Sequence, residues 1–160
     1  MYHRLLGLAA YSLSSYTGMD PEIRKFVIHD LAAATFVPYN EDGSVNYAGV
    51  DAHCKDLAVH GVPFAFVNGT TGDSMILREE ERKLLAEAWV SAGKKYSVKI
   101  VNHVGAQGLQ ETCELARHAQ ACGCDAISVM PPQFFKTNGP KGLALWLKAV
   151  GESAPKMPIY

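Results

Sequence analysis

The sequence predicts an α/β fold of repeated βα units, arranged as the amino-terminal half of an eightfold βα (TIM) barrel. Apolar strand-like segments alternate with amphipathic helical ones, and the predicted strands recur about 30 residues apart, the length of one βα unit. The glycine-rich phosphate loops GxGxxG and GxxxxGKS/T do not occur. This absence favours the half-barrel over part of an open doubly wound sheet. The five strands start at Leu31, Pro63, Val98, Asp125 and Met157.

The first predicted unit begins with the apolar run LAAATFV at residues 31–37. Pro38 and the turn-rich segment NEDGS end this strand. Asn46 is the predicted N-cap of the following helix, and Gly61 is its stop signal. The apolar stripe of this helix consists of Val50, Cys54 and Leu57.

The second predicted strand, PFAFVNG at residues 63–69, is apolar on both faces, as a buried parallel strand is. The segment 77–95 is the second predicted helix. It has acids near its start and two lysines near its end, and both interact favourably with the helix dipole. Gly93 and these two lysines, Lys94 and Lys95, close the helix. One face of this helix carries Leu84, Leu85, Ala88 and Trp89.

The remaining segments continue the same alternation. Residues 97–105 and 125–132 are the third and fourth predicted strands, and residues 143–150 form the fourth helix. MPIY, residues 157–160, begins a fifth strand. The third helix ends at Gly123 and has the apolar stripe Leu109, Cys113, Ala116 and Ala119.

We interpret residues 1–25 as an amino-terminal extension and residues 26–160 as one incomplete barrel domain. The first residues hold His3, Arg4 and a short apolar run, which resembles a weak signal or transit peptide. A small-residue cleavage site is not evident, so an unstructured or mispredicted extension is the favoured alternative. The apolar run is too short to span a bilayer, and no later segment resembles a membrane helix.

Composition excludes several classes of function. The chain has 160 residues, 48% of them hydrophobic, and a formal net charge of −1. Its scattered basic residues argue against nucleic acid or an acidic membrane as a partner. Histidines and carboxylates do not cluster at metal-ligand spacing. The cysteines lack CxxC spacing, which indicates reduced thiols and a cytoplasmic location; they are Cys54, Cys113, Cys122 and Cys124.

The segment FVNGTTGDS, residues 66–74, carries the most distinctive chemistry. Thr70 and Thr71 directly follow the second strand, where barrel enzymes place their active sites. Two hydroxyls, together with the backbone N–H groups freed by Gly69 and Gly72, suit a small carboxylate without adding positive charge. The alternative is that both threonines cap the next helix or stabilise a turn, and local spacing leaves both readings open.

Several ordered motifs resemble the N-acetylneuraminate lyase branch of the dihydrodipicolinate synthase-like, pyruvate-dependent class I aldolases. The resemblance runs from about Phe26 to Tyr160. HVG at residues 103–105 favours the lyase branch over the dihydrodipicolinate synthases. The motifs, in order, are AAATFVPYNEDGSVNY, FVNGTTGDS, Glu81-Arg82, VNHVGAQ and GCDAISVMPPQFF.

This resemblance implies that Thr70 and Thr71 bind the carboxylate of a pyruvate moiety. Gly69, Gly72 and Asp73 would support the loop, and Asp73 stands where the family has a longer glutamate. His103 is expected to orient the site or pack rather than transfer protons. Phe134 and Phe135 stand in a region where some members carry a tyrosine, and we expect them to pack in the barrel or an interface.

The catalytic residues of the family are expected to lie outside this sequence. The resemblance implies a Schiff-base lysine on strand six and a proton-transfer tyrosine at the end of strand five, about two positions beyond Tyr160. Lys99 and Lys136 are poorly placed to replace that lysine, and no separate cofactor is implied. We therefore expect this chain alone to be inactive, marginally stable and prone to associate through its open edges.

Three functional hypotheses follow. The favoured one is reversible cleavage of N-acetylneuraminate (sialic acid) to N-acetylmannosamine and pyruvate by a cytoplasmic enzyme that is a homotetramer by family resemblance. The second keeps the aldolase chemistry for another 2-oxo acid adduct, as in the dihydrodipicolinate synthases. The third is a non-catalytic truncated partner of a full-length lyase.

Overall fold

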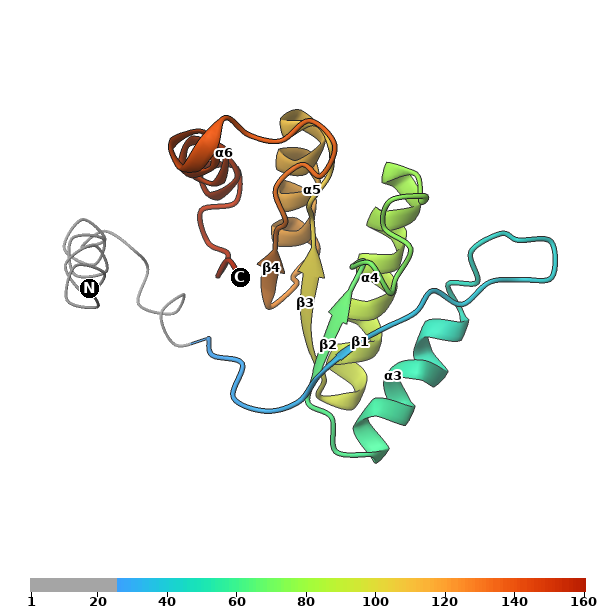
Figure 1. Ribbon diagram of the computed structural model, residues 1–160. Coiled ribbons are helices and arrows are strands. Elements are labelled where there is room, and N and C mark those ends of the chain that lie inside the picture. The colour runs from blue at the N-terminus through green and yellow to red at the C-terminus, as the bar shows by residue number, and fades with distance from the viewer. Residues whose placement is uncertain (1–25) are drawn as a thin grey trace, which may run out of the picture.

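A computed structural model describes residues 26–160, and the predicted extension at residues 1–25 lies outside the described residues. Four parallel strands form one sheet in the order β1-β2-β3-β4 (Figure 1). The strands are β1 (Ala32–Ala34), β2 (Phe64–Val67), β3 (Lys99–His103) and β4 (Ala126–Ser128). The helices are α3 (Gly49–Val59), α4 (Glu79–Tyr96), α5 (Leu109–Cys122) and α6 (Gly139–Ser153).

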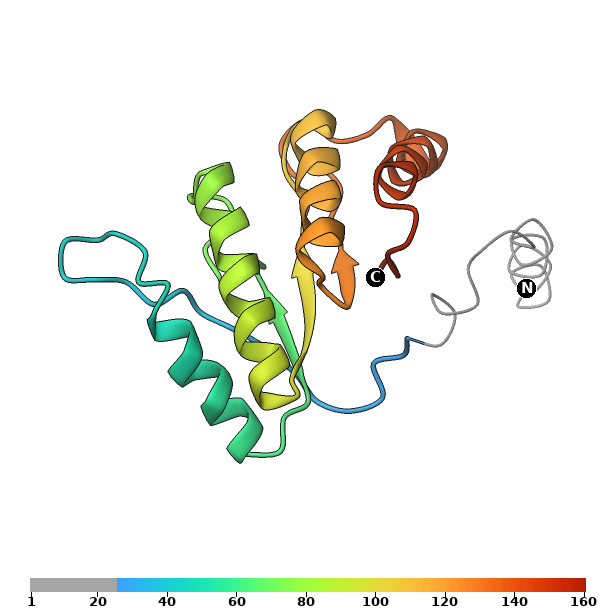
Figure 2. The same ribbon diagram turned by 180° about the vertical axis from the view of Figure 1, so that it is seen from behind.

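The strand order identifies the architecture. Each strand pairs with the next strand in sequence, so the order never reverses as it does at the switch point of a doubly wound sheet. Helices α4 and α5 lie on one face of the sheet, and α3 packs beside α4 (Figure 2). Helices on one side and an uninterrupted parallel order are the features of a partial βα barrel, which confirms the predicted fold class.

The predicted beginning of a fifth strand is also present. The N–H of Ile127 donates to the carbonyl of Pro158 at 2.9 Å, and the N–H of Val129 donates to the carbonyl of Tyr160 at 3.0 Å. Ile127 and Ile159 form a parallel bridge. Residues 158–160 therefore extend the sheet beyond β4 in the same direction.

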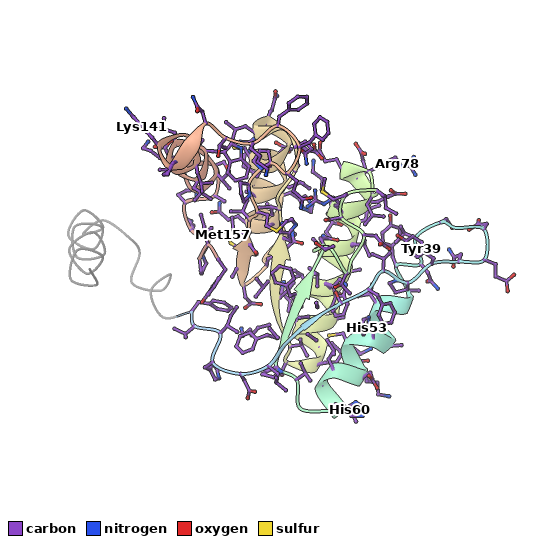
Figure 3. All side chains as sticks on the ribbon, in the orientation of Figure 1. Tyr39, His53, His60, Arg78, Lys141 and Met157 are labelled. Atoms are coloured by element: carbon purple, nitrogen blue, oxygen red, sulfur yellow. The ribbon has the colours of Figure 1, made fainter. Side chains whose placement is uncertain are left out.

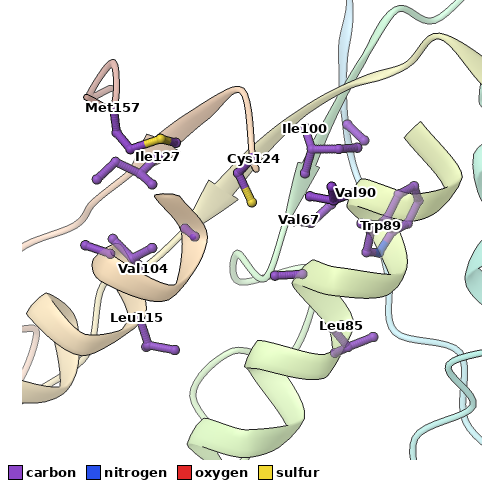
Figure 4. Packing of buried hydrophobic residues seen from close by; sticks show 14 of the residues in the cluster. Val67, Leu85, Trp89, Val90, Ile100, Val104, Leu115, Cys124, Ile127 and Met157 are labelled. Atoms are coloured by element: carbon purple, nitrogen blue, oxygen red, sulfur yellow. The ribbon is translucent and has the colours of Figure 1, made fainter. Parts of the chain in front are cut away.

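The core lies between the sheet and the helices (Figure 4). Leu85 and Trp89 of α4 pack in the same cluster as Val67 of β2 and Ile100 of β3. Trp89 is only 2% exposed. Burying a large apolar side chain stabilises the folded state by roughly 1.5–3 kcal/mol, so this cluster determines how α4 packs on the sheet.

The second predicted helix differs from expectation on its buried face and at its end. Leu84, assigned to that face, is 47% exposed, whereas Arg82 is 2% exposed. Helix α4 is therefore rotated about its axis so that the charged Arg82 side chain points inward. The helix runs to Tyr96, one residue beyond the predicted segment, with Ser97 in the left-handed conformation at φ 62°. A Cβ on Gly93 would lie 2.5 Å from the carbonyl oxygen of Val98, so glycine here permits close packing.

Two smaller predictions are corrected as well. The N-cap of α3 is Ala48 rather than Asn46. The Asn46 side chain still accepts a hydrogen bond from the N–H of Gly49 at 3.1 Å, so it organises the turn just before the helix. Leu109, assigned to the buried stripe of α5, is 40% exposed, while Leu115 is buried instead.

Candidate functional site

The GTTG loop leaves the carboxyl end of β2 through a tight backbone turn. Asn68 and Asp73 both have positive φ values, 56° and 53°, in the left-handed region. Asparagine and aspartate tolerate this conformation better than most residues. Within the loop, the N–H of Gly72 donates to the carbonyl of Gly69 at 3.0 Å, and the N–H of Asp73 donates to the carbonyl of Thr70 at 3.1 Å. The loop is thus a closed backbone turn.

The turn leaves successive backbone donors unpaired. Among residues 26–160, the backbone N–H groups of Gly69, Thr70 and Thr71 have no hydrogen-bond acceptor. Thr70 and Thr71 are both exposed. Helix α4 begins at Glu79, with Arg78 as its N-cap, so the threonines do not cap it. Successive unpaired N–H groups next to two exposed hydroxyls are donors suited to an anion.

Close packing of the two glycines holds the loop against the sheet. A Cβ on Gly72 would lie 3.1 Å from the carbonyl oxygen of Thr35 and 3.2 Å from the nitrogen of Asn68. A Cβ on Gly69 would lie 2.5 Å from the Phe66 ring. Side chains at either position would push the loop away from the ends of β1 and β2.

A buried polar network lies beneath the loop. The Nδ2 group of Asn68 donates to Oδ1 of Asn102 at 2.8 Å and to the carbonyl of Arg82 at 3.0 Å. Nη2 of Arg82 in turn donates to the carbonyl of His103 at 2.9 Å. All four residues are at most 6% exposed. Because a buried amide or guanidinium is costly without partners, these bonds hold β2, β3 and α4 in one arrangement.

His103 is held on both ring nitrogens. Its Nδ1 lies 3.1 Å from the carbonyl of Asn68, and its Nε2 accepts from the N–H of Met130 at 3.4 Å. Burial, and then the nearby Arg82 charge, lower the pKa of His103 to about 4. The ring is therefore neutral at pH 7, with Nδ1 as the donor. This geometry suits an orienting residue.

Asp73 connects the loop to the segment after β1. Its carboxylate accepts a hydrogen bond from the hydroxyl of Tyr39 at 3.0 Å. Burial and this hydrogen bond raise the pKa of Tyr39. Tyr39 and Arg78 lie toward one end of the helix layer, opposite His60 at the end of α3 (Figure 3). Asp73, although shorter than the glutamate of the family, thus makes a hydrogen bond that stabilises the loop.

The other residues singled out from sequence lie apart from the loop. Lys99 stands at the start of β3 and pairs with Asp125 at 2.9 Å, far from the carboxyl ends of the strands. Phe134 and Phe135 are 80% and 79% exposed and contact each other edge to face. Their expected packing is therefore not satisfied within residues 26–160. Lys136 follows them in the same exposed loop.

Sequence reasoning missed the residues that support the loop. Asn68, Asn102 and Tyr39 received no role, and Arg82 was noted only as part of a motif. Asn68 carried a usable signal, because an Asn-Gly pair after an apolar strand is typical of a left-handed turn. The inward direction of Arg82 depends on helix rotation and had no local signal.

Within residues 26–160, no group of three histidine, cysteine or acidic side chains is arranged to hold a metal ion. No helix in this same range is long and apolar enough to cross a membrane.

Comparison with known proteins gives a consistent set of matches. The dihydrodipicolinate synthetase family matches residues 28–160. The N-acetylneuraminate lyase of Danio rerio is 41% identical over 143 residues, which is 89% of this chain and 46% of that protein. The lyase of Homo sapiens is 40% identical over 134 residues, 83% of this chain and 42% of that protein.

Solved structures show the same relationship. The Proteus mirabilis N-acetylneuraminate lyase superposes with a TM-score of 0.79 at 39% identity, covering 83% of this chain and 45% of that one. Dihydrodipicolinate synthase from Aquifex aeolicus superposes with a TM-score of 0.77 at 26% identity, covering 82% of this chain and 44% of that one. The chain thus spans less than half the length of the relatives it matches.

Proposed function

This chain belongs to the dihydrodipicolinate synthetase family, and we propose that it forms the pyruvate-binding half of an N-acetylneuraminate lyase. The proposed reaction is the reversible cleavage of N-acetylneuraminate to N-acetylmannosamine and pyruvate. The observation that carries the proposal is the exposed Thr70-Thr71 pair with its free backbone donors at the carboxyl end of β2. These donors would hold the carboxylate of the substrate.

A neutral carboxylate site fits the chemistry of an imine-forming aldolase. A cation beside the carboxylate would disfavour a second positive charge nearby, including that of the protonated imine through which such an aldolase works. Hydroxyl and N–H donors bind the carboxylate without that electrostatic effect. The family resemblance implies a Schiff-base lysine on strand six and a tyrosine at the end of strand five, which residues 26–160 do not include.

In this proposal, the buried polar network orients the GTTG loop. Asn68 begins the loop, and its side chain and carbonyl are tied to Asn102 and His103. Asp73 ties the far side of the loop to Tyr39. Fixing both ends of the loop places the donors before substrate arrives, which lowers the entropic cost of binding.

Identity favours sialic acid over another 2-oxo acid adduct as the substrate. The curated relatives at about 40% identity are N-acetylneuraminate lyases, whereas the Aquifex aeolicus dihydrodipicolinate synthase is 26% identical. By the same resemblance, we propose a homotetrameric, cytoplasmic whole enzyme, with residues 26–160 as its first half-barrel. The free state of all four cysteines is compatible with a reducing compartment.

Reconstitution of the barrel tests this function. The chain is co-expressed with the part of the Danio rerio lyase that follows the matched region, and pyruvate release from N-acetylneuraminate is measured. The zebrafish enzyme divided at the same point is the positive control, and each half alone is the negative control. Turnover by the mixed barrel supports the proposal.

A double variant tests whether the activity of the reconstituted barrel depends on the carboxylate site. Replacing Thr70 and Thr71 with valine removes both hydroxyls at similar volume. A hydrogen bond to a charged group contributes roughly 1.5–3 kcal/mol, so we expect at least a tenfold loss in kcat/KM. Ser91→Ala, on an exposed position of α4, is the matched control. A stable mixed complex that cleaves only another 2-oxo acid adduct would contradict the sialic acid assignment.

A further inference from the structure

Two cysteines meet at the end of the molecule opposite the GTTG loop. Cys122 is the last residue of α5, and Cys124 precedes β4. Their Sγ atoms are 3.7 Å apart. All the cysteines of the chain are free thiols in this structure, so the close pair is a reduced dithiol.

The backbone between them fixes this approach. Gly123 has a φ of 91°, in the left-handed region, and forms the C-cap of α5. The N–H groups of Gly123 and Cys124 both donate to the carbonyl of Ala119, at 3.2 and 3.0 Å. This turn brings both thiols to the same side of the chain. A disulfide requires sulfurs about 2 Å apart, so the two Sγ atoms, at 3.7 Å, must move closer for the bond to form.

The two thiols differ in their access to solvent. Cys122 is partly exposed and lines an open groove of about 590 Å³ between α4 and α5. Cys124 is 7% exposed. The groove is otherwise lined by Glu87, Val90, Ser91 and Lys94. A dissolved oxidant therefore reaches Cys122 first.

The contact between the two thiols favours a thiolate on Cys122. The hydrogen bond between the thiols, and then the nearby His118, lower the pKa of Cys122 to about 7, against the opposing effects of burial and Glu87. The same hydrogen bond and burial raise the pKa of Cys124. His118 itself pairs with Glu87 at 2.8 Å. Lys94 Nζ lies 3.6 Å from the position a Cβ would take on Gly123. One accessible thiolate beside one protonated thiol is the arrangement of an attacking and a resolving cysteine.

We propose that Cys122 and Cys124 are a redox-active dithiol that a small-molecule disulfide, such as oxidised glutathione, converts to an intramolecular disulfide. In the first step the Cys122 thiolate attacks one sulfur of glutathione disulfide, forming a mixed disulfide and releasing one glutathione thiolate. Cys124 then loses its proton to water and attacks Cys122 Sγ, which releases the second glutathione thiolate. Two protein thiols are oxidised by two electrons, and one glutathione disulfide is reduced to two thiols.

Peptide mapping of the wild-type chain tests the proposal. The chain is incubated with oxidised glutathione, alkylated with iodoacetamide and digested with trypsin. Cleavage after Arg117 and Lys136 gives a peptide that contains Cys122 and Cys124 and no other cysteine. We expect this peptide to be unalkylated and lighter than its reduced form by two hydrogens, while Cys113 remains alkylated.

Two variants separate the attacking thiol from the resolving one. Cys124→Ser should stop the reaction at a glutathione adduct on Cys122, and Cys122→Ser should leave Cys124 unmodified. Cys113→Ser, at a partly exposed position on the same helix, is the matched control and should react like wild type. With a pKa near 7, Cys122 should be alkylated about threefold faster at pH 7 than an ordinary thiol of pKa about 8.5.

Either of two results would overturn the proposal. One is a stable glutathione adduct on Cys122 in the wild-type chain, without loss of the second glutathione. The other is oxidation of Cys113 as readily as the pair. Both are read directly from the peptides of the wild-type protein, so they do not depend on the folding of a variant or on lyase activity.

Discussion

His103 illustrates at the residue scale how burial converts a titratable side chain into a structural one. Its ring is 6% exposed and contacts Asn68 and Met130. Burial disfavours the protonated ring, and the nearby Arg82 charge disfavours it further, so its pKa falls to about 4. The same contacts that orient the ring therefore suppress its acid–base chemistry at neutral pH.

The lowered pKa predicts a pH dependence of stability. Above about pH 7.5 the histidine is neutral in both the folded and unfolded states. As the pH falls towards 4, only the unfolded state takes up the proton, so His103 should reduce the free energy of unfolding by up to about 3 kcal/mol. Urea denaturation of wild type and His103→Gln between pH 4 and 7 measures this contribution.

An exposed histidine provides the control for that experiment. His60 is exposed at the end of α3, so His60→Gln reports the effect of the same substitution at a surface position. The difference between wild type and His103→Gln isolates His103 from the acids that titrate in the same range. Equal pH slopes for these two proteins would show that His103 is protonated equally in the folded and unfolded states.

The bond between Tyr39 and Asp73 makes a second residue-scale prediction. The two groups are 3.0 Å apart, and the bond lies near the molecular surface. A neutral or exposed hydrogen bond contributes roughly 0.5–1.5 kcal/mol, so Tyr39→Phe should weaken pyruvate binding by about threefold to tenfold if the bond orders the loop. Calorimetric titration of the reconstituted barrel with pyruvate measures the change.

A double-mutant cycle distinguishes loop ordering from a general loss of packing. Asp73→Asn and Tyr39→Phe should each weaken binding, and the combined variant should be little worse than either one. Fully additive losses would indicate that the two side chains act independently.

At the element scale, the junction of α4 and β3 depends on one close approach. Gly93 lies inside α4, and a Cβ there would lie 2.5 Å from the carbonyl oxygen of Val98 and 3.0 Å from Ile100. The helix and the strand that follows it therefore pack backbone against backbone. Helix propensity alone would favour alanine at this position.

Opposite effects of two glycine substitutions test this reading. Gly93→Ala should lower the free energy of unfolding by roughly 1–3 kcal/mol through overpacking. Gly142→Ala, inside α6, meets only ordinary contacts at 3.7 Å and should raise it by about 1 kcal/mol. Thermal and urea unfolding of both variants provide the comparison. If both substitutions stabilise the protein, the backbone at the start of β3 moves to accommodate the added Cβ without lowering the free energy of unfolding.

At the scale of the whole molecule, β1 is an edge strand that has no second strand partner among residues 26–160. Ala32 and Ala34 of β1 are exposed, and so are Leu31 and Phe36 on either side of the strand. The phenylalanine pair at residues 134–135 adds further exposed apolar surface. Unpaired strand edges and apolar patches of this kind promote association between chains.

Charge placed on that edge should reduce association of the 160-residue chain. Ala32→Lys with Ala34→Lys adds two cations to β1 without removing a buried side chain. We expect sedimentation velocity to show concentration-dependent association in wild type and a mainly monomeric double variant. Ala121→Lys, at an exposed position on α5, controls for added charge. If that control dissociates the chains equally well, the edge is not the contact.

The sequence by itself determined the order and kind of the elements. Apolar runs of strand length alternate with stripes of helical period, and these patterns are local. Every predicted strand start lies within one residue of an observed strand start for β1 to β4. The GTTG loop was likewise visible, because its glycines and threonines are consecutive in the chain.

Only the tertiary structure decided what surrounds that loop and which way the side chains point. Arg82 is buried and Leu84 exposed because α4 rotates to fit the sheet, a choice made by packing across distant segments. Asn68, Asn102 and Tyr39 acquire their roles through bonds to residues about 14 to 35 positions away in the chain. Such contacts leave no periodic signal in the sequence, because their geometry exists only once β2, β3 and α4 are assembled.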